Sequence, residues 1–106
     1  MRSCLFFCLV AAALFPSTEA SAQTVLKSGK IVRVSVFAAG NYAFRILLNV
    51  PVPECVDGFF YVDATDPNYQ VYTAGLLAAA STNRSIQVQA VLQSGFCRIA
   101  NYNIEF

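Results

Sequence analysis

The 106-residue sequence contains no histidine and no tryptophan, one methionine and only four cysteines. Without histidine, the chain cannot build the Ser–His or Cys–His pairs of nucleophilic catalysis, nor a metal site that depends on imidazole. Its five glycines occur singly, so no glycine-rich phosphate-binding loop is present. We therefore predict a protein that is not an enzyme and that carries no cofactor and no metal.

Charge of either sign is also scarce. Seven lysines and arginines stand against six acidic residues, a net charge of +1, and neither sign forms a run. Binding to nucleic acid depends on a clustered basic face, and binding to an anionic membrane surface depends on a polybasic segment. The composition predicts neither kind of partner.

The first 22 residues have the pattern of a secretory signal peptide. Arg2 supplies the positive start, an apolar stretch runs from Leu5 to Leu14, and Ala20-Ser21-Ala22 has the small residues of a cleavage site. A membrane-spanning helix needs about 20 apolar residues, roughly twice this stretch. We predict no membrane span, a signal peptide at 1–22, and a single domain at 23–106 that is secreted or periplasmic. The alternative is an uncleaved interfacial anchor.

Cleavage would leave two cysteines, Cys55 and Cys97. Outside the cytosol such a pair is oxidised more often than free. The bridge would close a loop of about 43 residues, which contributes on the order of 4 kcal/mol in the chain-entropy model. A domain of this size is marginally stable without such a link. We predict a structural Cys55–Cys97 disulfide.

Period-two alternation predicts strands over most of the mature chain. After a short polar lead at 23–28, the first strand places two sets of side chains on opposite faces, with Val32, Val34 and Val36 inside and Arg33 and Ser35 outside. The turn residues at 38–41 then connect it to a second strand. The first strand is expected at 31–37 and the others at 42–48, 58–63, 86–92 and 97–103, the last extending to the C-terminus. One face of the second strand holds Tyr42, Phe44, Ile46 and Leu48, and one face of the fourth holds Ile86, Val88, Ala90 and Leu92.

The period changes to that of a helix over residues 68–80. Asp66 is expected as its N-cap and Pro67 as its first residue, while Gly75 weakens it by about 1 kcal/mol. The order strand, strand, strand, helix, strand, strand is that of an OB-fold, a five-stranded Greek-key barrel. We predict a mostly β fold with one helix, as an OB-like five-stranded barrel. The alternative is an open α+β sheet with one helix packed across it.

Two groups of polar residues are candidates for a site. One group lies on the outward faces of the strands and offers hydrogen-bond donors suited to sugar hydroxyls or a carboxylate, with a freer tyrosine near the C-terminus: Arg33, Arg45, Gln87, Gln89, Arg98 and Tyr102. The alternative for this group is an ordinary solvated sheet face. The other is Asp63 with Asp66, which could be half of a calcium site or a general acid/base pair. We favour a structural role, in which Asp66 caps the helix and Asp63 lies near its positive end.

Several motifs occur together along the mature chain: Gly29-Lys30-Ile31-Val32, Cys55, Phe59-Phe60-Tyr61-Val62-Asp63, Asp66-Pro67, Leu76-Leu77-Ala78-Ala79-Ala80, Ser85-Ile86-Gln87-Val88 and Cys97. This set resembles the exported B-subunits of subtilase cytotoxin and pertussis-like toxins, together with related small secreted bacterial proteins. The resemblance extends roughly from Gly29 to Ile99 and concerns core residues, so it speaks to fold more than to activity.

The resemblance implies an OB-fold and, for the toxin members, a homo-oligomeric ring of five subunits that binds sialylated glycans. Those members carry a longer segment ahead of the first matched strand, so no sugar-contacting residue is transferred to this chain. Two functions remain open: an exported, glycan-binding module like a toxin B-subunit, or a secreted or periplasmic protein that binds another protein or has a structural role.

Overall fold

The computed structural model describes residues 23–106, so the predicted signal peptide lies outside the described residues. In chain order the elements are β1 (Thr24–Val36), β2 (Phe44–Leu48), the 3₁₀ turn η1 (Val56–Gly58), β3 (Phe60–Val62), α2 (Tyr69–Ser81), β4 (Ser85–Gln93) and β5 (Phe96–Ile104). The predicted order of five strands and one helix is confirmed. Within the described part of the chain, no helix is long and apolar enough to cross a membrane.

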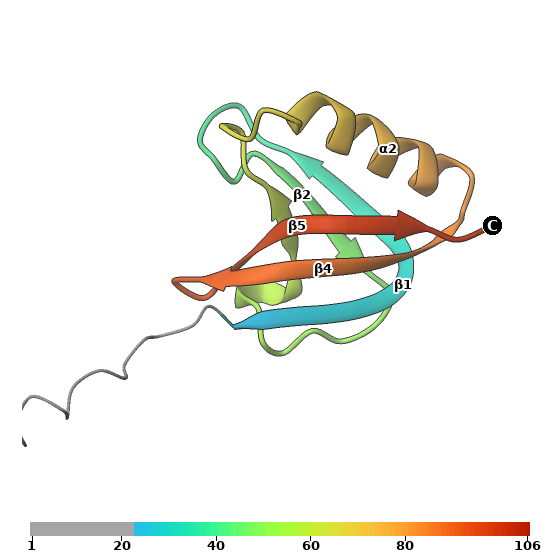
Figure 1. The fold of residues 1–106 in the computed structure, drawn as a ribbon, viewed down its shortest axis with the longest axis horizontal. Coiled ribbons are helices and arrows are strands. Elements are labelled where there is room, and N and C mark those ends of the chain that lie inside the picture. Colours follow the sequence, from blue (N-terminus) through green and yellow to red (C-terminus); the bar gives the residue numbers. More distant parts are fainter. Residues whose placement is uncertain (1–22) are drawn as a thin grey trace, which may run out of the picture.

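The five strands form one sheet that closes on itself in the order β1-β2-β3-β5-β4 (Figure 1). Closure depends on β1, because its residues 24–30 pair with β4 and its residues 31–36 pair with β2. The pairing of β3 with β5 is parallel, and all the other pairings are antiparallel. The helix α2 lies across one end of the closed sheet.

Two expectations for the first strand are wrong. Residues 24–28 are not a polar lead, because they already belong to β1 and pair with β4. Val36 lies opposite the buried Phe44 and so shares the inward face with Val34, but at the end of the strand its side chain is 71% exposed. Val32 does not face the core, and its side chain is 60% exposed. The pairing register with β2 shifts between Ile31 and Arg33, and such a bulge reorients the strand. The core contacts of this region come instead from Val25, with Ile31 and Val34 partly buried.

The core fills the space between the closed sheet and α2. The predicted inner faces of β2 and β4 are confirmed, since the alternate residues Phe44, Ile46, Leu48, Ile86, Val88 and Ala90 are buried. Leu76 and Ala79 are the buried residues of α2. Tyr72 and Tyr102 pack against the edge of this core.

The predicted disulfide is present. Cys55 and Cys97 are bonded, with their Cα atoms 5.5 Å apart. Cys55 precedes η1, whereas Cys97 lies on β5 opposite Phe60 of β3. The bridge therefore ties the connection after β2 to the place where β3 and β5 pair.

The start of the helix differs from the prediction by two residues. Asn68, not Asp66, is the N-cap residue, and it makes no side-chain capping bond. Asp66 Oδ1 instead accepts a hydrogen bond from the Asn68 main-chain N–H (2.8 Å), and Asp63 Oδ1 accepts from the Thr65 N–H (2.9 Å). Both carboxylates thus shape the turns that lead into α2, because an aspartate readily bonds to the main chain two residues ahead.

Candidate functional site

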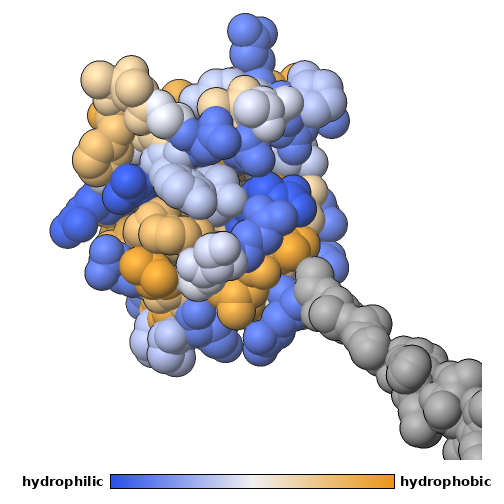
Figure 2. All heavy atoms as spheres, turned by 90° about the vertical axis from the view of Figure 1, so that its left-hand side faces the viewer, coloured by the Kyte–Doolittle hydropathy of each residue, from blue (hydrophilic) through white to orange (hydrophobic). Residues whose placement is uncertain are grey.

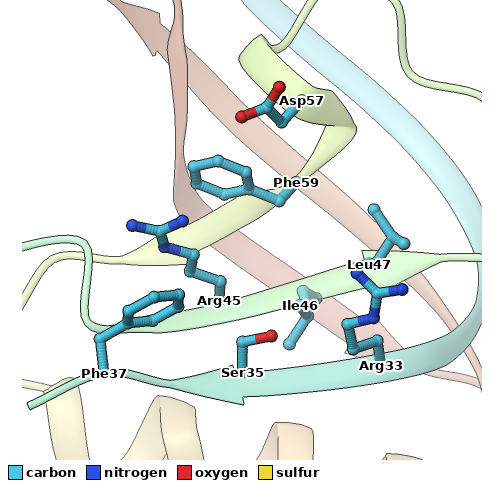
Figure 3. Close-up of a pocket in the computed structure, with 8 residues that line it drawn as sticks. All are labelled: Arg33, Ser35, Phe37, Arg45, Ile46, Leu47, Asp57 and Phe59. Carbon is cyan, nitrogen blue, oxygen red and sulfur yellow. The ribbon is translucent and has the colours of Figure 1, made fainter.

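Two of the predicted residues, Arg33 and Arg45, lie on the outer face of the sheet and line one hollow of about 300 Å³. In the β1–β2 register Arg33 is opposite Leu47, and Ser35 is opposite Arg45. Together with Phe37, Asp57 and Phe59 these side chains surround the hollow (Figure 3). We call the set Arg33, Ser35, Phe37, Arg45, Leu47, Asp57 and Phe59 the arginine face.

Arg45 is held in place on three sides. Its Nε donates a hydrogen bond to the Tyr42 carbonyl (2.8 Å). Its guanidinium carbon lies 4.1 Å from the centre of the Phe37 ring and 4.5 Å from that of Phe59. Figure 3 shows the guanidinium between the two rings, with Arg33 at the other end of the hollow. A guanidinium stacked in this way is restrained before any ligand arrives, and its terminal N–H groups remain available for an oxyanion.

The turn η1 supplies the acidic group of the arginine face. Asp57 adopts a left-handed conformation (φ 55°), which aspartate tolerates better than most residues. In Figure 3 its carboxylate lies beyond the Phe59 ring as seen from Arg45. The face thus has two cationic side chains and one carboxylate, which favours a ligand of net negative charge.

An aromatic cluster adjoins the arginine face at the end of the sheet where the 37–43 loop and the β4–β5 turn lie. The Tyr42 ring stacks on Phe96 (4.6 Å between centres) and meets Tyr61 edge-on (4.4 Å). Burial beneath this cluster raises the pKa of the Tyr61 hydroxyl, with smaller contributions from Tyr42 and Asp63. Viewed from that end, hydrophobic patches and hydrophilic groups interleave over the surface (Figure 2).

Arg98 is in the same row of the sheet as Arg45, because Tyr61 is the register partner of both. The Arg98 Nε donates to Gln93 Oε1 (3.2 Å), which also accepts from the Tyr61 hydroxyl (3.4 Å). Arg98 is therefore beside the aromatic cluster and not among the residues that line the hollow.

The two glutamines lie elsewhere. In β4, Gln89 Oε1 accepts a hydrogen bond from Asn101 Nδ2 of β5 (3.2 Å), and Gln87 is opposite Asn103. These carboxamides form a neutral polar surface over β4 and β5. The structure does not bring the six predicted residues into one patch.

Tyr102 is not the free side chain that its position near the C-terminus suggested. Its hydroxyl donates to the Tyr72 carbonyl (2.9 Å), and the two rings meet edge-on with centres 5.8 Å apart. Burial raises the pKa of this hydroxyl, with a smaller contribution from Tyr72. Tyr102 borders a second hollow, between α2 and β5.

Sequence reasoning missed the aromatic part of the arginine face. The sequence predicts Phe37 only as the end of the first strand and Phe59 only as part of the third. A usable signal was the period of two: Phe37 follows Arg33 and Ser35 at alternate positions, which places all three on the outer face. The contact of Arg45 with Phe59 had no such signal, because it joins β2 to a turn 14 residues away.

No protein-family model, no curated protein and no solved structure matches this chain. Its resemblance to the toxin B-subunits accordingly stays a prediction. Among residues 23–106 no three histidine, cysteine or acidic side chains group together as metal ligands would.

Proposed function

We propose that the chain is an exported, non-enzymatic binding module with an OB-fold, and that its arginine face binds an acidic glycan. The order of the elements supports the fold, because the helix falls between the third and fourth strands of a closed sheet. Barrels of this type bind oligosaccharides on the face of their second and third strands and in the adjoining loops. The arginine face lies on β1, β2 and the turn η1, and it shares with that ligand surface the strand β2 and the start of the β1–β2 loop at Phe37.

The observation that carries the proposal is the restrained Arg45 beside an exposed aromatic ring. Phe37 is 49% exposed, so one part of its surface is available for the apolar face of a sugar. The terminal N–H groups of Arg45 suit a carboxylate in bidentate geometry, and Ser35 adds a hydroxyl within the same hollow. Restraint of the guanidinium before binding lowers the entropy that binding would otherwise cost.

A glycan array tests this proposal with residues 23–106 and three variants. We expect retention on carboxylated or sulfated glycans, with loss of about tenfold or more in Arg45→Gln and Arg33→Gln, since truncating a charged hydrogen bond costs roughly 2 kcal/mol. Arg84→Gln is the matched control, because the Arg84 guanidinium lies over Phe106 and not in the arginine face. Absence of glycan retention, or equal retention by all three variants, would contradict the proposal.

Assembly into a ring of subunits belongs to the same proposal. Leu26, Val32 and Val36 of β1 are exposed apolar side chains and provide surface that a neighbouring copy would cover. The mass of residues 23–106 in solution by light scattering tests this part. A monomer at every concentration would remove the ring and leave glycan binding to be judged by the array.

A protein ligand is the second candidate function. It is favoured by the second hollow, of about 410 Å³, which is lined mainly by apolar and amide side chains between α2 and β5. Neither arginine of the arginine face borders it. In this case the chain would act as a secreted or periplasmic interaction or structural protein.

A further inference from the structure

The edge of β5 that faces α2 is open along most of its length. On that side β3 pairs only with Cys97 and Arg98, whereas β5 continues to Ile104. Within residues 23–106, no strand lies beside the remainder of this edge. Unpaired strand edges present main-chain donors and acceptors to any extended segment that reaches them.

The register shows which main-chain groups face outward along this edge. The Glu105 N–H donates to the Ser85 carbonyl of β4 (2.9 Å). Hydrogen-bonded pairs alternate along an antiparallel ladder, so Asn103 and Asn101 also direct their main-chain groups to β4. Tyr102 and Ile104 therefore direct theirs away from β4, towards the open side.

The pairing of β4 with β1 confirms this alternation independently. The Leu92 N–H donates to the Gln23 carbonyl of the adjacent segment (2.9 Å). Alternate β4 residues, Val88 and Ile86 among them, then bond to β1. These two are the register partners of Tyr102 and Ile104. Further back along β5, the Ala100 carbonyl is occupied, because it accepts the Tyr72 hydroxyl (2.8 Å).

The second hollow lies along this open edge. It has a volume of about 410 Å³ and is lined by Val71, Tyr72, Asn101, Tyr102, Asn103, Ile104 and Phe106. None of these side chains is charged. Val71 on α2 is 69% exposed and Phe106 is 91% exposed, so both leave apolar surface uncovered.

We propose that an extended peptide segment of a partner protein adds as a strand to the open edge of β5, with apolar side chains at alternate positions that enter the second hollow. Main-chain bonds to Tyr102 and Ile104 would fix its backbone, as in other cases of strand addition. Its inner side chains would meet Val71 and Ile104, and its outer ones the neutral carboxamides of Asn101 and Asn103. The inference rests on the second candidate function and is independent of the arginine face.

The chemistry of the lining selects this occupant. A strand beside β5 has period-two alternation, so only every second side chain reaches the hollow. A charged side chain there would lose hydration without an ion partner. The segment is therefore alternately apolar and uncharged polar, and about six residues long to cover β5 from 99 to 104.

The probe is a blocked hexapeptide of alternating leucine and threonine, titrated into residues 23–106 and followed by NMR hydrogen exchange. The amides of Tyr102 and Ile104 should exchange quickly in the free protein and slowly with the peptide bound. Those of Asn101 and Asn103 should exchange slowly in both states, because they already bond to β4.

Two N-methylated peptides test the main-chain bonds. One carries N-methyl groups on its leucines and the other on its threonines, and the side chains are unchanged. In antiparallel addition the leucine N–H groups point at β5, and in parallel addition the threonine N–H groups do. We expect one of the two analogues to lose binding and the other to keep it. Equal binding of both would overturn the proposal.

Val71→Asp and Leu77→Asp form a matched pair of protein variants. Both residues are exposed on α2, but only Val71 lines the hollow. Val71→Asp should weaken peptide binding about tenfold, because it places a carboxylate against an apolar side chain, whereas Leu77→Asp should not change it.

Three other results would overturn the proposal: no binding at about 1 mM peptide, equal binding by both variants, or concentration-dependent self-association that Val71→Asp abolishes and the peptide does not. The last would assign this edge to a second copy of the chain. Arg45→Gln should leave peptide binding intact, which separates a failure here from a failure of the glycan proposal.

Discussion

Gly75 lies in the middle of α2, where glycine favours the helix less than alanine does. In an exposed helix, replacing glycine by alanine would stabilise the protein by about 1 kcal/mol. Here a Cβ at position 75 would overlap the Tyr102 hydroxyl and lie 3.2 Å from its Cζ. That hydroxyl donates to the Tyr72 carbonyl of the same helix. We predict that Gly75→Ala destabilises the protein in spite of its helix propensity.

The expected size of the effect follows from the contacts that Tyr102 would lose. Its hydrogen bond to Tyr72 contributes about 1 kcal/mol, and the edge-on ring pair contributes about 1 kcal/mol beyond burial. After the gain in helix propensity, the net loss is about 1 kcal/mol. In a Tyr102→Phe background the clashing hydroxyl is absent, so Gly75→Ala should be neutral or stabilising. The coupling between the two positions should therefore be about 1–2 kcal/mol.

Urea unfolding of residues 23–106 with the disulfide intact measures all four members of this cycle. A loss of 1 kcal/mol corresponds to a shift of the midpoint by roughly 1 M for a small domain. Ala74→Gly, at an exposed position of the same helix, measures the helix-propensity difference between alanine and glycine without the contact to Tyr102. If Gly75→Ala stabilised the protein equally with Tyr102 and with Phe at position 102, the predicted clash between a Cβ at position 75 and the Tyr102 hydroxyl would be refuted.

Two further predictions concern stability. Replacing Cys55 and Cys97 together by alanine should lower the free energy of unfolding by about 4 kcal/mol in the chain-entropy model, since the bridged residues are 42 positions apart. In the denatured parent protein, both cysteines should resist a thiol label until a reductant is added. Hydrogen bonds from the Thr65 main-chain N–H, and to a smaller extent from its hydroxyl, lower the pKa of Asp63 in the folded protein. The Asp63 carboxylate therefore stabilises the fold fully above its pKa in the unfolded chain, about 4, and this stabilisation is lost as the pH falls through the lower pKa of the folded protein. Asp63→Asn should thus cost about 0.5–1 kcal/mol near pH 7, a modest figure because the site is solvent-exposed, and the unfolding curves of the variant and the parent should converge in acid.

The arrangement of the elements along the chain could be predicted because it depends on local pattern. Alternation in β2 and β4 identified Phe44, Ile46, Ile86 and Val88 as inward-facing, and they are buried. The Ser94-Gly95 turn between β4 and β5 has positive φ at both positions, as the sequence of a tight hairpin suggests. The Cys55–Cys97 pair followed from the count of cysteines in residues 23–106, the part of the chain after the predicted signal peptide. Each of these inferences needs only neighbours in sequence or a single possible partner.

The start of β1 and the orientation of Val32 could not be predicted in the same way. Residues 24–28 are polar enough to resemble a lead, and they become a strand because β4 pairs with them. Val32 fits the inward pattern, but it lies at the bulge after Ile31 and its side chain is exposed. Pairing and register are properties of two strands, so one strand's sequence does not determine them.

The same limit applies to the candidate sites. The sequence by itself determined the absence of histidine chemistry, the near-neutral charge, the order of five strands and one helix along the chain and the outward position of Arg33 and Arg45. Only the tertiary structure decided that Arg45 lies between Phe37 and Phe59, that Gln87 and Gln89 belong to a different surface, and that β5 has an open edge beside α2. The physical reason is that side-chain alternation fixes which face a residue occupies, whereas strand order and turn geometry fix which residues share that face.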